Sequence, residues 1–428
     1  MKALAELIRG DMKIAYGVTE PGAIAYACAK AHSLCGGKVS AVELAVNSGI
    51  YKNAFTCAIP GTKEKGNGWA AALGAVAGDA EKQLAALDGL TARQIAEAGA
   101  LIESGAVTVK MQNISPVILI DATVKTENGV GRAVIEHTHT SLTLLQKNGE
   151  TVFQAAAEQA EDDPCEEIKA RTLEELVDYA KTVPIEELAF LREAFSTDLA
   201  LYEEGKKEGK TPITQALIDE NDGRELSRDL KKSMSIFACG PIEARATGAA
   251  APAMSITGSG SHGIIAMMPL YAAGKVLDKT EEEVLRAVCL SCLVTIYIKE
   301  YSGRLSALCG CALAGGTGTA CGLVLLRGGE KEQIAAAVGH MAASLTGMIC
   351  HGGNHGCALK ALAAVQLACD SAMLALRGVE MEPCHSILGS TPELTMQNIG
   401  YIASPGMSAT EETIVEIMET RKTPRAGR

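Results

Sequence analysis

The sequence contains few aromatic side chains and fewer positive than negative charges. Its 428 residues include one Trp, five Phe and nine Tyr. The cores must therefore be built mainly from Ala, Leu, Ile and Val. Lys and Arg number 39 against 51 Asp and Glu, which gives a formal net charge of −12. This charge and the lack of a basic run argue against nucleic acid as a partner.

The sequence also lacks the signals of secretion and membrane insertion. Its N-terminal segment, MKALAELIRGDMK, is an amphipathic helix pattern without the apolar core and cleavage site of a signal peptide. Two long uncharged runs, 246–274 and 305–326, are interrupted by glycine or proline, which favours buried active-site backbone over a membrane span. We therefore expect a cytoplasmic protein whose fourteen cysteines are thiols or metal ligands rather than disulfides.

Length and residue patterns together predict an α+β fold. A chain of 428 residues favours two or three sub-domains. We predict a mainly helical protein with an inserted antiparallel β-meander and a glycine-rich helical catalytic half. The predicted regions are an N-terminal helical region that contributes to the active site (1–105), an antiparallel sheet (106–155), a helical region (156–234) and a catalytic, cluster-binding region (235–428).

Turn and capping signals support these elements. Val, Ile and Thr dominate residues 106–153, and Asn-Gly turns at 128–129 and 148–149 predict β-hairpins. His137 and His139, two residues apart, are expected to share one face of a strand, as a solvated or hydrogen-bonded pair rather than a metal site. Capping boxes predict three helix starts, at Thr91/Gln94, Thr172/Glu175 and Thr280/Glu283.

Near the N-terminus, Thr19 is the predicted N-cap of a further helix. Glu20 and Pro21 would then lie in its first turn, where a carboxylate and a proline are both favourable. Glu20 either stabilises that helix or serves as an acid beside a glycine-flanked turn.

A Gly/Ser loop, Thr257–Gly263, precedes an apolar helix pattern. Backbone N–H groups at such a helix start can bind an anion. The Gly-Lys-Ser/Thr ending of a phosphate-binding P-loop is missing, so a small carboxylate fits better, with Ser259 and Ser261 as its ligands. The alternative is a flexible turn.

The cysteines occur in two kinds of sequence pattern, of which one favours buried structural side chains and the other a functional site. Cys289 and Cys292 lie inside an apolar helix pattern, which favours buried small side chains over a redox or zinc pair. Cys309-Gly310-Cys311 instead opens a glycine-rich run. Just before it, Lys299 and Arg304 could each bind a substrate carboxylate, or form an ordinary surface salt bridge.

The segment Cys350–Cys357 holds two thiols, two imidazoles and an amide among three glycines, and a long apolar helix pattern begins at its second cysteine. A tight loop with two buried cysteines is the simple interpretation. With a thiol from Cys309 or Cys311 it would supply three ligands, as for an iron–sulfur cubane with one open iron. A zinc site, which needs four ligands, would require His351, His355 or Cys384 as well.

Together these segments resemble the L-cysteine desulfidase family, which is itself similar to the alpha part of iron–sulfur L-serine dehydratases. The resemblance covers nearly the whole chain and rests on six segments: Thr19-Glu20-Pro21, Gly258-Ser259-Gly260, Tyr297-Ile298-Lys299, Gly303–Cys311, Gly347–Cys350 and Cys357–Lys360.

The resemblance implies an oxygen-sensitive [4Fe–4S] cluster held by three cysteines and no pyridoxal phosphate. The implied ligands are Cys350, Cys357 and one of Cys309 and Cys311. The implied reaction is β-elimination from a small L-amino acid, with sulfide leaving cysteine or water leaving serine, to give pyruvate and ammonia.

The chain departs from the family pattern at three places. Val18 stands where the family has the cysteine thought to be the base, Ser261-His262 replaces Asn-Gln, and His351-Gly352-Gly353 replaces Asp-Gly-Ala. Histidine is a natural replacement base, because its pKa lies near neutrality. The candidate catalytic residues are therefore His262, His351, His355 and Glu20, and the candidate substrate ligands are Ser259, Ser261, Lys299, Arg304 and Asn354.

Three functions follow as hypotheses. The first is an iron–sulfur lyase acting on L-cysteine, the second is the same chemistry on serine, threonine or another β-substituted acid, and the third is a non-catalytic zinc- or ligand-binding relative. The expected partner is a small amino acid, a homo-oligomer is left open, and neither nucleic acid nor a membrane is expected.

Overall fold

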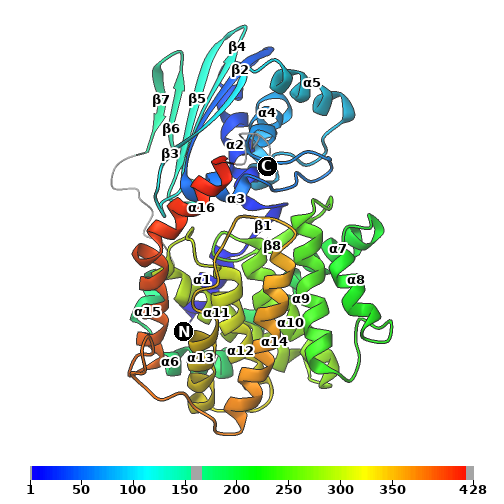
Figure 1. The fold of residues 1–428 in the computed structure, drawn as a ribbon, viewed down its shortest axis with the longest axis vertical. Helices are drawn as coiled ribbons and strands as arrows, with labels where there is room; N and C mark the ends of the chain where they lie inside the picture. Colours follow the sequence, from blue (N-terminus) through cyan, green and yellow to red (C-terminus); the bar gives the residue numbers. More distant parts are fainter. Residues whose placement is uncertain (1, 156–165, 421–428) are drawn as a thin grey trace, which may run out of the picture.

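The computed structural model describes residues 2–155 and 166–420, arranged as two lobes (Figure 1). The upper lobe holds a large sheet and the helices that cover it. The lower lobe is helical and contains the longest helices of the chain. The fold is therefore α+β and mainly helical, as predicted. The predicted boundary between the sheet (106–155) and the helical region (156–234) falls next to residues 156–165, which lie outside the described part of the chain.

A six-stranded mixed sheet forms the upper lobe, in the order β3-β2-β4-β5-β6-β7. Strands β4 to β7 form the predicted antiparallel meander, and both Asn-Gly turns are present. The prediction is wrong for β3, which was expected in the antiparallel sheet but pairs with β2 in parallel, and for β2, which pairs antiparallel with β4 from within the region 1–105 predicted to be helical. The strands are β2 (Val39–Asn47), β3 (Val107–Asn113), β4 (Leu119–Thr126), β5 (Gly129–Glu136), β6 (Leu142–Lys147) and β7 (Glu150–Gln154).

One face of this sheet packs against helices. Ile120, Ala122 and Val124 alternate along β4 and are fully buried, as expected where every second residue faces a core. On β5, Gly131 allows close approach of α2, because a Cβ there would lie 1.9 Å from the Ala31 carbonyl oxygen. The upper-lobe helices are α2 (Thr19–Ser33), α3 (Ser48–Ala54), α4 (Asn67–Ala77), η1 (Ala80–Ala85) and α5 (Ala92–Glu103).

Two local predictions in this lobe are wrong. His137 and His139 do not share a strand face, because β5 ends at Glu136 and the chain turns through 137–141 before β6, with a positive φ of 67° at His137. His139 is thereby turned inward and buried. The N-cap of α2 is Val18 rather than Thr19, and the Thr19 hydroxyl donates instead to the Glu20 carboxylate.

The lower lobe is built around five long apolar helices, and all three predicted capping boxes of the chain are present. Among the described residues, α14 alone is long and apolar enough to cross a membrane, and it packs against α9, α12 and α13. The central helices are α9 (Leu230–Ala246), α10 (Gly260–Val276), α11 (Glu281–Ser302), α12 (Gly316–Leu326) and α14 (Cys357–Leu376).

Shorter elements complete this lobe and join it to the sheet lobe. β1 (Lys13–Tyr16) pairs antiparallel with β8 (Pro252–Ser255) between the lobes. The remaining helices are α1 (Lys2–Asp11), η2 (Glu166–Ala170), α6 (Leu173–Thr182), η3 (Ile185–Leu188), α7 (Leu191–Lys207), α8 (Pro212–Asp219), η4 (Cys311–Gly315), α13 (Lys331–Leu345), α15 (Pro392–Tyr401), η5 (Ile402–Gly406) and α16 (Ser408–Thr420).

Asp198, fully buried on α7, makes stability depend on pH. One carboxylate oxygen accepts from the Met254 N–H at 2.9 Å, while the other has no hydrogen-bond partner in the described chain. Burial raises the pKa of Asp198 to about 8. Since the unfolded chain releases this proton near pH 4, the folded state binds more protons between these values. The free energy of unfolding should therefore fall as pH rises from about 4 to about 8.

Asp198→Asn should remove this slope, because the amide is neutral and still accepts from Met254. Near pH 8 we expect the variant to exceed the wild type by at least about 1 kcal/mol in unfolding free energy, with the difference vanishing towards about pH 4. Urea titrations across this range measure it, with the exposed Asp219→Asn as control. Parallel slopes for wild type and Asp198→Asn would refute the assignment.

Candidate active site

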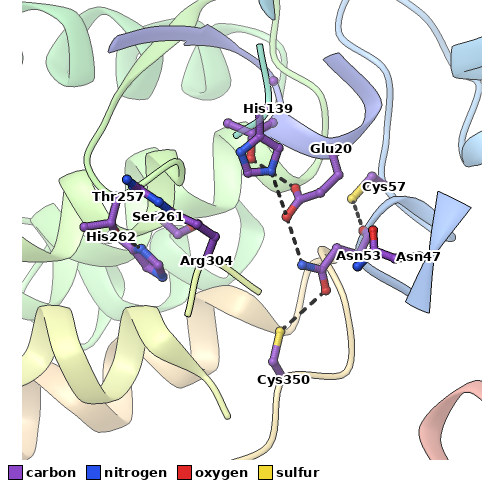
Figure 2. A network of polar contacts seen from close by, with 12 residues as sticks. Glu20, Asn47, Asn53, Cys57, His139, Thr257, Ser261, His262, Arg304 and Cys350 are labelled. Carbon is purple, nitrogen blue, oxygen red and sulfur yellow. Dashed lines mark hydrogen bonds and ion pairs between the residues drawn. The ribbon is translucent and has the colours of Figure 1, made fainter. Parts of the chain in front are cut away.

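The candidate active site lies between the two lobes (Figure 2). Residues at the start of α2 and the end of α3 contribute from the upper lobe, together with the loop between β5 and β6. The lower lobe contributes the start of α10 and the segments that carry the candidate cysteine ligands.

A single β-bridge places the two main cysteine segments side by side. Leu308 and Ile349 form an antiparallel bridge, in which the Cys309 N–H donates to the Met348 carbonyl at 2.8 Å. The Cys350 N–H donates in turn to the Ala307 carbonyl at 2.6 Å. Cys309 and Cys350 are thus neighbours in space although α12 and α13 lie between them in the chain.

The thiols of this region differ in their protonation. Cys309 Sγ lies 3.4 Å from Cys311 Sγ, and both are buried. The hydrogen bond with the Cys311 thiol, helped by the charges of Lys360 and Lys299 and opposed by burial, lowers the pKa of Cys309 to about 6. The same contact, with burial, raises the pKa of Cys311 well above its usual range. Because the charges of Lys360 and Lys299 favour a thiolate at Cys309, we assign Cys311 as the hydrogen-bond donor of the pair.

The Cys350–Cys357 loop rests on the end of α3. The Gly353 N–H donates to the Asn53 carbonyl at 3.0 Å, and the Cys57 thiol donates to the carbonyls of Asn53 (2.7 Å) and Gly353 (3.1 Å). A Cβ on Gly353 would lie 2.4 Å from Cys57 Sγ and 3.2 Å from Val18 Cγ1. Burial and Glu20 raise the pKa of Cys57 well above its usual range, so its thiol stays protonated and holds the loop in place.

A site for one metal ion is not preformed. In the ranges 2–155 and 166–420, no three His, Cys, Asp or Glu side chains are placed to hold a single ion. The zinc alternative, completed by His351, His355 or Cys384, therefore finds no support in the described residues, and Cys384 is exposed. The structure instead places several thiols on adjacent segments.

His262 faces these thiols from the start of α10. Its Nδ1 lies 2.6 Å from the Thr257 hydroxyl, whose own hydrogen is donated to the Ile256 carbonyl at 2.7 Å. We assign the ring proton to Nδ1, because the Thr257 hydroxyl can then donate to Ile256, and this leaves the lone pair on Nε2. Burial, then Lys299 and Arg245, hold the pKa of His262 well below its usual range, so the ring is a neutral base.

His262 and Lys299 meet at the glycine between Cys309 and Cys311. A Cβ on Gly310 would lie 2.8 Å from His262 Nε2 and 3.2 Å from Lys299 Nζ. Lys299 is buried and donates to the Arg304 carbonyl at 3.3 Å, so it is not a surface salt bridge. Burial, with the nearby Arg304, lowers the pKa of Lys299 to about 8.

Two arginines lie on the same side of the site as His262. Arg245 is buried and donates to the Gly17 carbonyl at 3.0 Å and to the Ser261 hydroxyl at 2.9 Å. Arg304 forms an ion pair with Asp11 at 3.1 Å. Figure 2 shows Ser261 and Arg304 beside His262 and across from Glu20. This positive charge next to a helix N-terminus suits a small carboxylate.

A cavity of about 1140 Å³ leads to this site from the sheet. It lies over the face of the sheet that does not pack on helices, and its lining includes Asp11, His139, Gly258 and Arg304. A small ligand that enters the cavity can therefore reach site residues directly.

Comparison with known proteins identifies the family. A family model described as serine dehydratase alpha chain matches residues 81–416, which is well over half of the chain. The chain belongs to the serine dehydratase alpha chain family. Relatives include UPF0597 proteins of Clostridium botulinum strain Langeland (36% identical over 424 residues, 97% of this chain and 98% of the relative), Clostridium tetani (36% over 422, 98% of each) and Oleidesulfovibrio alaskensis (34% over 419, 97% of each). Membership indicates a serine-dehydratase-like or related lyase.

The other predicted site residues of this serine dehydratase alpha chain relative have local roles. Asn354 donates to His351 Nδ1 (2.9 Å) and to the Gly352 carbonyl (3.0 Å), so both side chains brace the cysteine loop. His355 bonds to the buried carboxylate of Glu243, which also accepts from Thr214 on α8. Ser259 is the N-cap residue of α10 without a side-chain capping bond.

Four residues of the site were missed as candidates in the sequence: Asn53, Cys57, His139 and Arg245. The sequence marks His139 only as one of two histidines that are two residues apart, and Arg245 lies in a helical pattern that carries no signal of a site. No short-range signal distinguishes Asn53 or Cys57 in this family member, because both act through contacts with segments far away in the sequence.

Proposed function

We propose that the protein is an iron–sulfur-dependent β-eliminating lyase of small L-amino acids, with L-cysteine as the default substrate, which it converts to pyruvate, ammonia and sulfide. The observation that carries the proposal is the bridge between Leu308 and Ile349, which sets Cys309 beside Cys350, with the next residue, Gly310, lying against His262 Nε2. Family membership supports the lyase class.

The donor set fits an iron–sulfur cluster. Soft thiolates select such clusters, and three thiolates leave one iron open. We assign Cys309, Cys350 and Cys357 as the ligands. Cys309 is preferred to Cys311 because Cys311 hydrogen-bonds to it and because Lys360 and Lys299 favour the Cys309 thiolate. When bound, the cluster would supply a Lewis acid for the leaving group or carboxylate of the substrate.

The residues of the chain would position the substrate and move its protons. Arg304 and the Arg245–Ser261 pair would bind its carboxylate. His262 Nε2 would accept the proton from Cα as the Cβ–S bond breaks, and Lys299 would protonate the departing sulfide. The aminoacrylate product tautomerises to an imine, and water hydrolyses it to pyruvate and ammonia. His262 thus takes the role that Val18 cannot perform.

The test is a pair of assays on anaerobically purified protein. L-Cysteine should yield pyruvate and sulfide in equal amounts, while L-serine should yield pyruvate more slowly. Faster turnover of L-serine would favour the family's dehydratase chemistry, which the family model itself suggests. Protein that carries zinc but neither iron nor sulfide would overturn the proposal.

Gly310→Ala should impair this chemistry without removing any functional group. The added methyl would press on His262 Nε2 and Lys299 Nζ and displace both. We expect kcat/KM to fall about 100-fold, the usual result of misplacing catalytic groups by about 1 Å. The control is Gly68→Ala on α4, where a Cβ meets nothing within 4 Å. An unchanged rate for Gly310→Ala would exclude His262 and Lys299 as the proton-transfer pair.

A further inference from the structure

Glu20 is a buried carboxylate whose hydrogen-bond donors are both neutral. The Thr19 hydroxyl donates to its Oε2 at 3.1 Å and the Asn53 amide to its Oε1 at 2.8 Å. His139, which can carry a positive charge, approaches this carboxylate, but its Nε2 lies 4.0 Å from Oε1, beyond hydrogen-bond distance. A buried negative charge without a bonded cation is unfavourable unless a ligand supplies one.

His139 presents an unsatisfied nitrogen to the same spot. Its side chain is 5% exposed, and Nε2 has no hydrogen-bond partner in the described ranges. Burial, only partly offset by Glu20, lowers the pKa of His139, so the ring is neutral. The other edge of the ring lies against Gly258, where a Cβ would be 3.0 Å from Nδ1. An orphaned nitrogen in a buried site commonly marks a missing ligand.

Asn53 holds the Glu20 carboxylate in place. Its Nδ2 donates to Glu20, which turns its Oδ1 towards Cys350, with Sγ 3.8 Å away (Figure 2). The Glu20 carboxylate and His139 Nε2 therefore face one small region, and Asn53 connects Glu20 to the segment of a candidate cluster ligand. With the proton of the neutral His139 ring assigned to Nδ1, Glu20 and His139 Nε2 are both acceptors, so the region suits a group that only donates hydrogen bonds.

We propose that Glu20 and His139 form the binding site for the α-ammonium group of the substrate, with Asn53 positioning the Glu20 carboxylate. An ammonium has three N–H donors and no acceptor. A nitrogen about 2.9 Å from both Glu20 Oε1 and His139 Nε2 is geometrically possible, because the 4.0 Å between them is less than twice that distance. The inference rests on the proposed function and identifies the residues that distinguish an amino acid from the corresponding acid without an amino group.

The surroundings orient such a substrate. His139 and Arg304 both line the cavity that leads in from the sheet. In Figure 2, Arg304 and Ser261 lie across the site from Glu20. A zwitterion would therefore place its ammonium at Glu20 and its carboxylate at the arginines, with the β-substituent left to face the cysteines.

The test compares two ligands that cannot undergo elimination. L-Alanine carries the α-ammonium and propionate lacks it, and calorimetry or ligand-observed NMR measures the binding of each to the full chain. Wild type should bind L-alanine much more tightly than propionate. Glu20→Gln should weaken L-alanine binding at least about 30-fold, as for loss of one partner of a buried charge pair, and leave propionate within about threefold.

Two further variants keep the result interpretable. His139→Phe retains the ring volume and should weaken L-alanine binding by about 5- to 10-fold, the value of one hydrogen bond. Glu81→Gln, an exposed acid paired with Lys30, is the matched control and should change neither ligand. Circular dichroism verifies that each variant is folded.

The outcomes separate this inference from the proposed function. Equal binding of L-alanine and propionate by wild type, or an unaltered L-alanine affinity in folded Glu20→Gln, would overturn the inference even if L-cysteine releases sulfide. Glu20-dependent binding of L-alanine without turnover of any amino acid would support the ammonium site and refute the lyase.

Discussion

Replacing Cys350 with serine is expected to remove iron and sulfide from anaerobically purified protein and to abolish its broad visible absorbance. A serine hydroxyl is a poor iron ligand in comparison with a soft thiolate. The backbone hydrogen bond from the residue 350 N–H to the Ala307 carbonyl would persist, so the segment should keep its position. Loss of a Lewis acid worth several kcal/mol should lower the elimination rate more than about 1000-fold. Iron and sulfide analysis and the pyruvate assay measure both effects.

The same measurements discriminate between Cys309 and Cys311. Cys309→Ser should behave like Cys350→Ser. Cys311→Ser should retain iron, because a serine hydroxyl can still donate a hydrogen bond to the Cys309 thiolate. Cys35→Ser, in the turn after α2, is the matched control. Full iron content in Cys350→Ser would contradict the ligand assignment, and iron loss confined to Cys311→Ser would reverse the choice within the pair.

Lys52→Met is expected to cause a large loss of stability. The Lys52 side chain is fully buried and joins three segments, since its ammonium donates to the Ser306 carbonyl at 3.1 Å and pairs with Glu411 of α16. Glu411 is also buried; its Oε2 binds Lys52, and its Oε1 has no hydrogen-bond partner in the described chain. Removal of Lys52 leaves that charge uncompensated, which typically costs about 3–5 kcal/mol of unfolding free energy.

Denaturant titration measures this loss, and two comparisons test its cause. Lys52→Met combined with Glu411→Leu should recover most of it, because no buried charge remains. Lys30→Met, which breaks the exposed pair with Glu81, should change stability by less than about 1 kcal/mol. A double variant no more stable than Lys52→Met would show that packing, rather than charge, makes Lys52 important.

Short-range signals made the secondary structure predictable. A capping box such as Thr280/Glu283 joins residues three apart, and an Asn-Gly turn acts within four residues, so both can be identified without knowledge of the fold. The parallel pairing of β2 with β3 could not be predicted in this way. It depends on a crossover through α3, α4 and α5, and the segment 38–53 contains both a strand and a helix.

The residues of the site likewise differ in whether a short-range sequence signal identifies them. The cysteine segments and the Gly/Ser loop are conspicuous because thiols and glycines cluster in short stretches. His139 became a candidate only when the turn after β5 brought it to Glu20, which lies more than a hundred residues earlier. Arg245 resembles a solvated helix residue until α9 is seen to be enclosed on all sides. Contacts between distant segments leave no trace in local periodicity.

The bridge between Leu308 and Ile349 also has a thermodynamic consequence. It closes the chain around α12 and α13, two helices packed on each other, so a group bound by both Cys309 and Cys350 would clamp the ends of that helical hairpin. A ligand that binds only the folded arrangement adds its binding free energy to that of unfolding. Loss of an oxygen-sensitive cluster would then loosen this hairpin as well as stop turnover, and air would act on the protein as a mild denaturant.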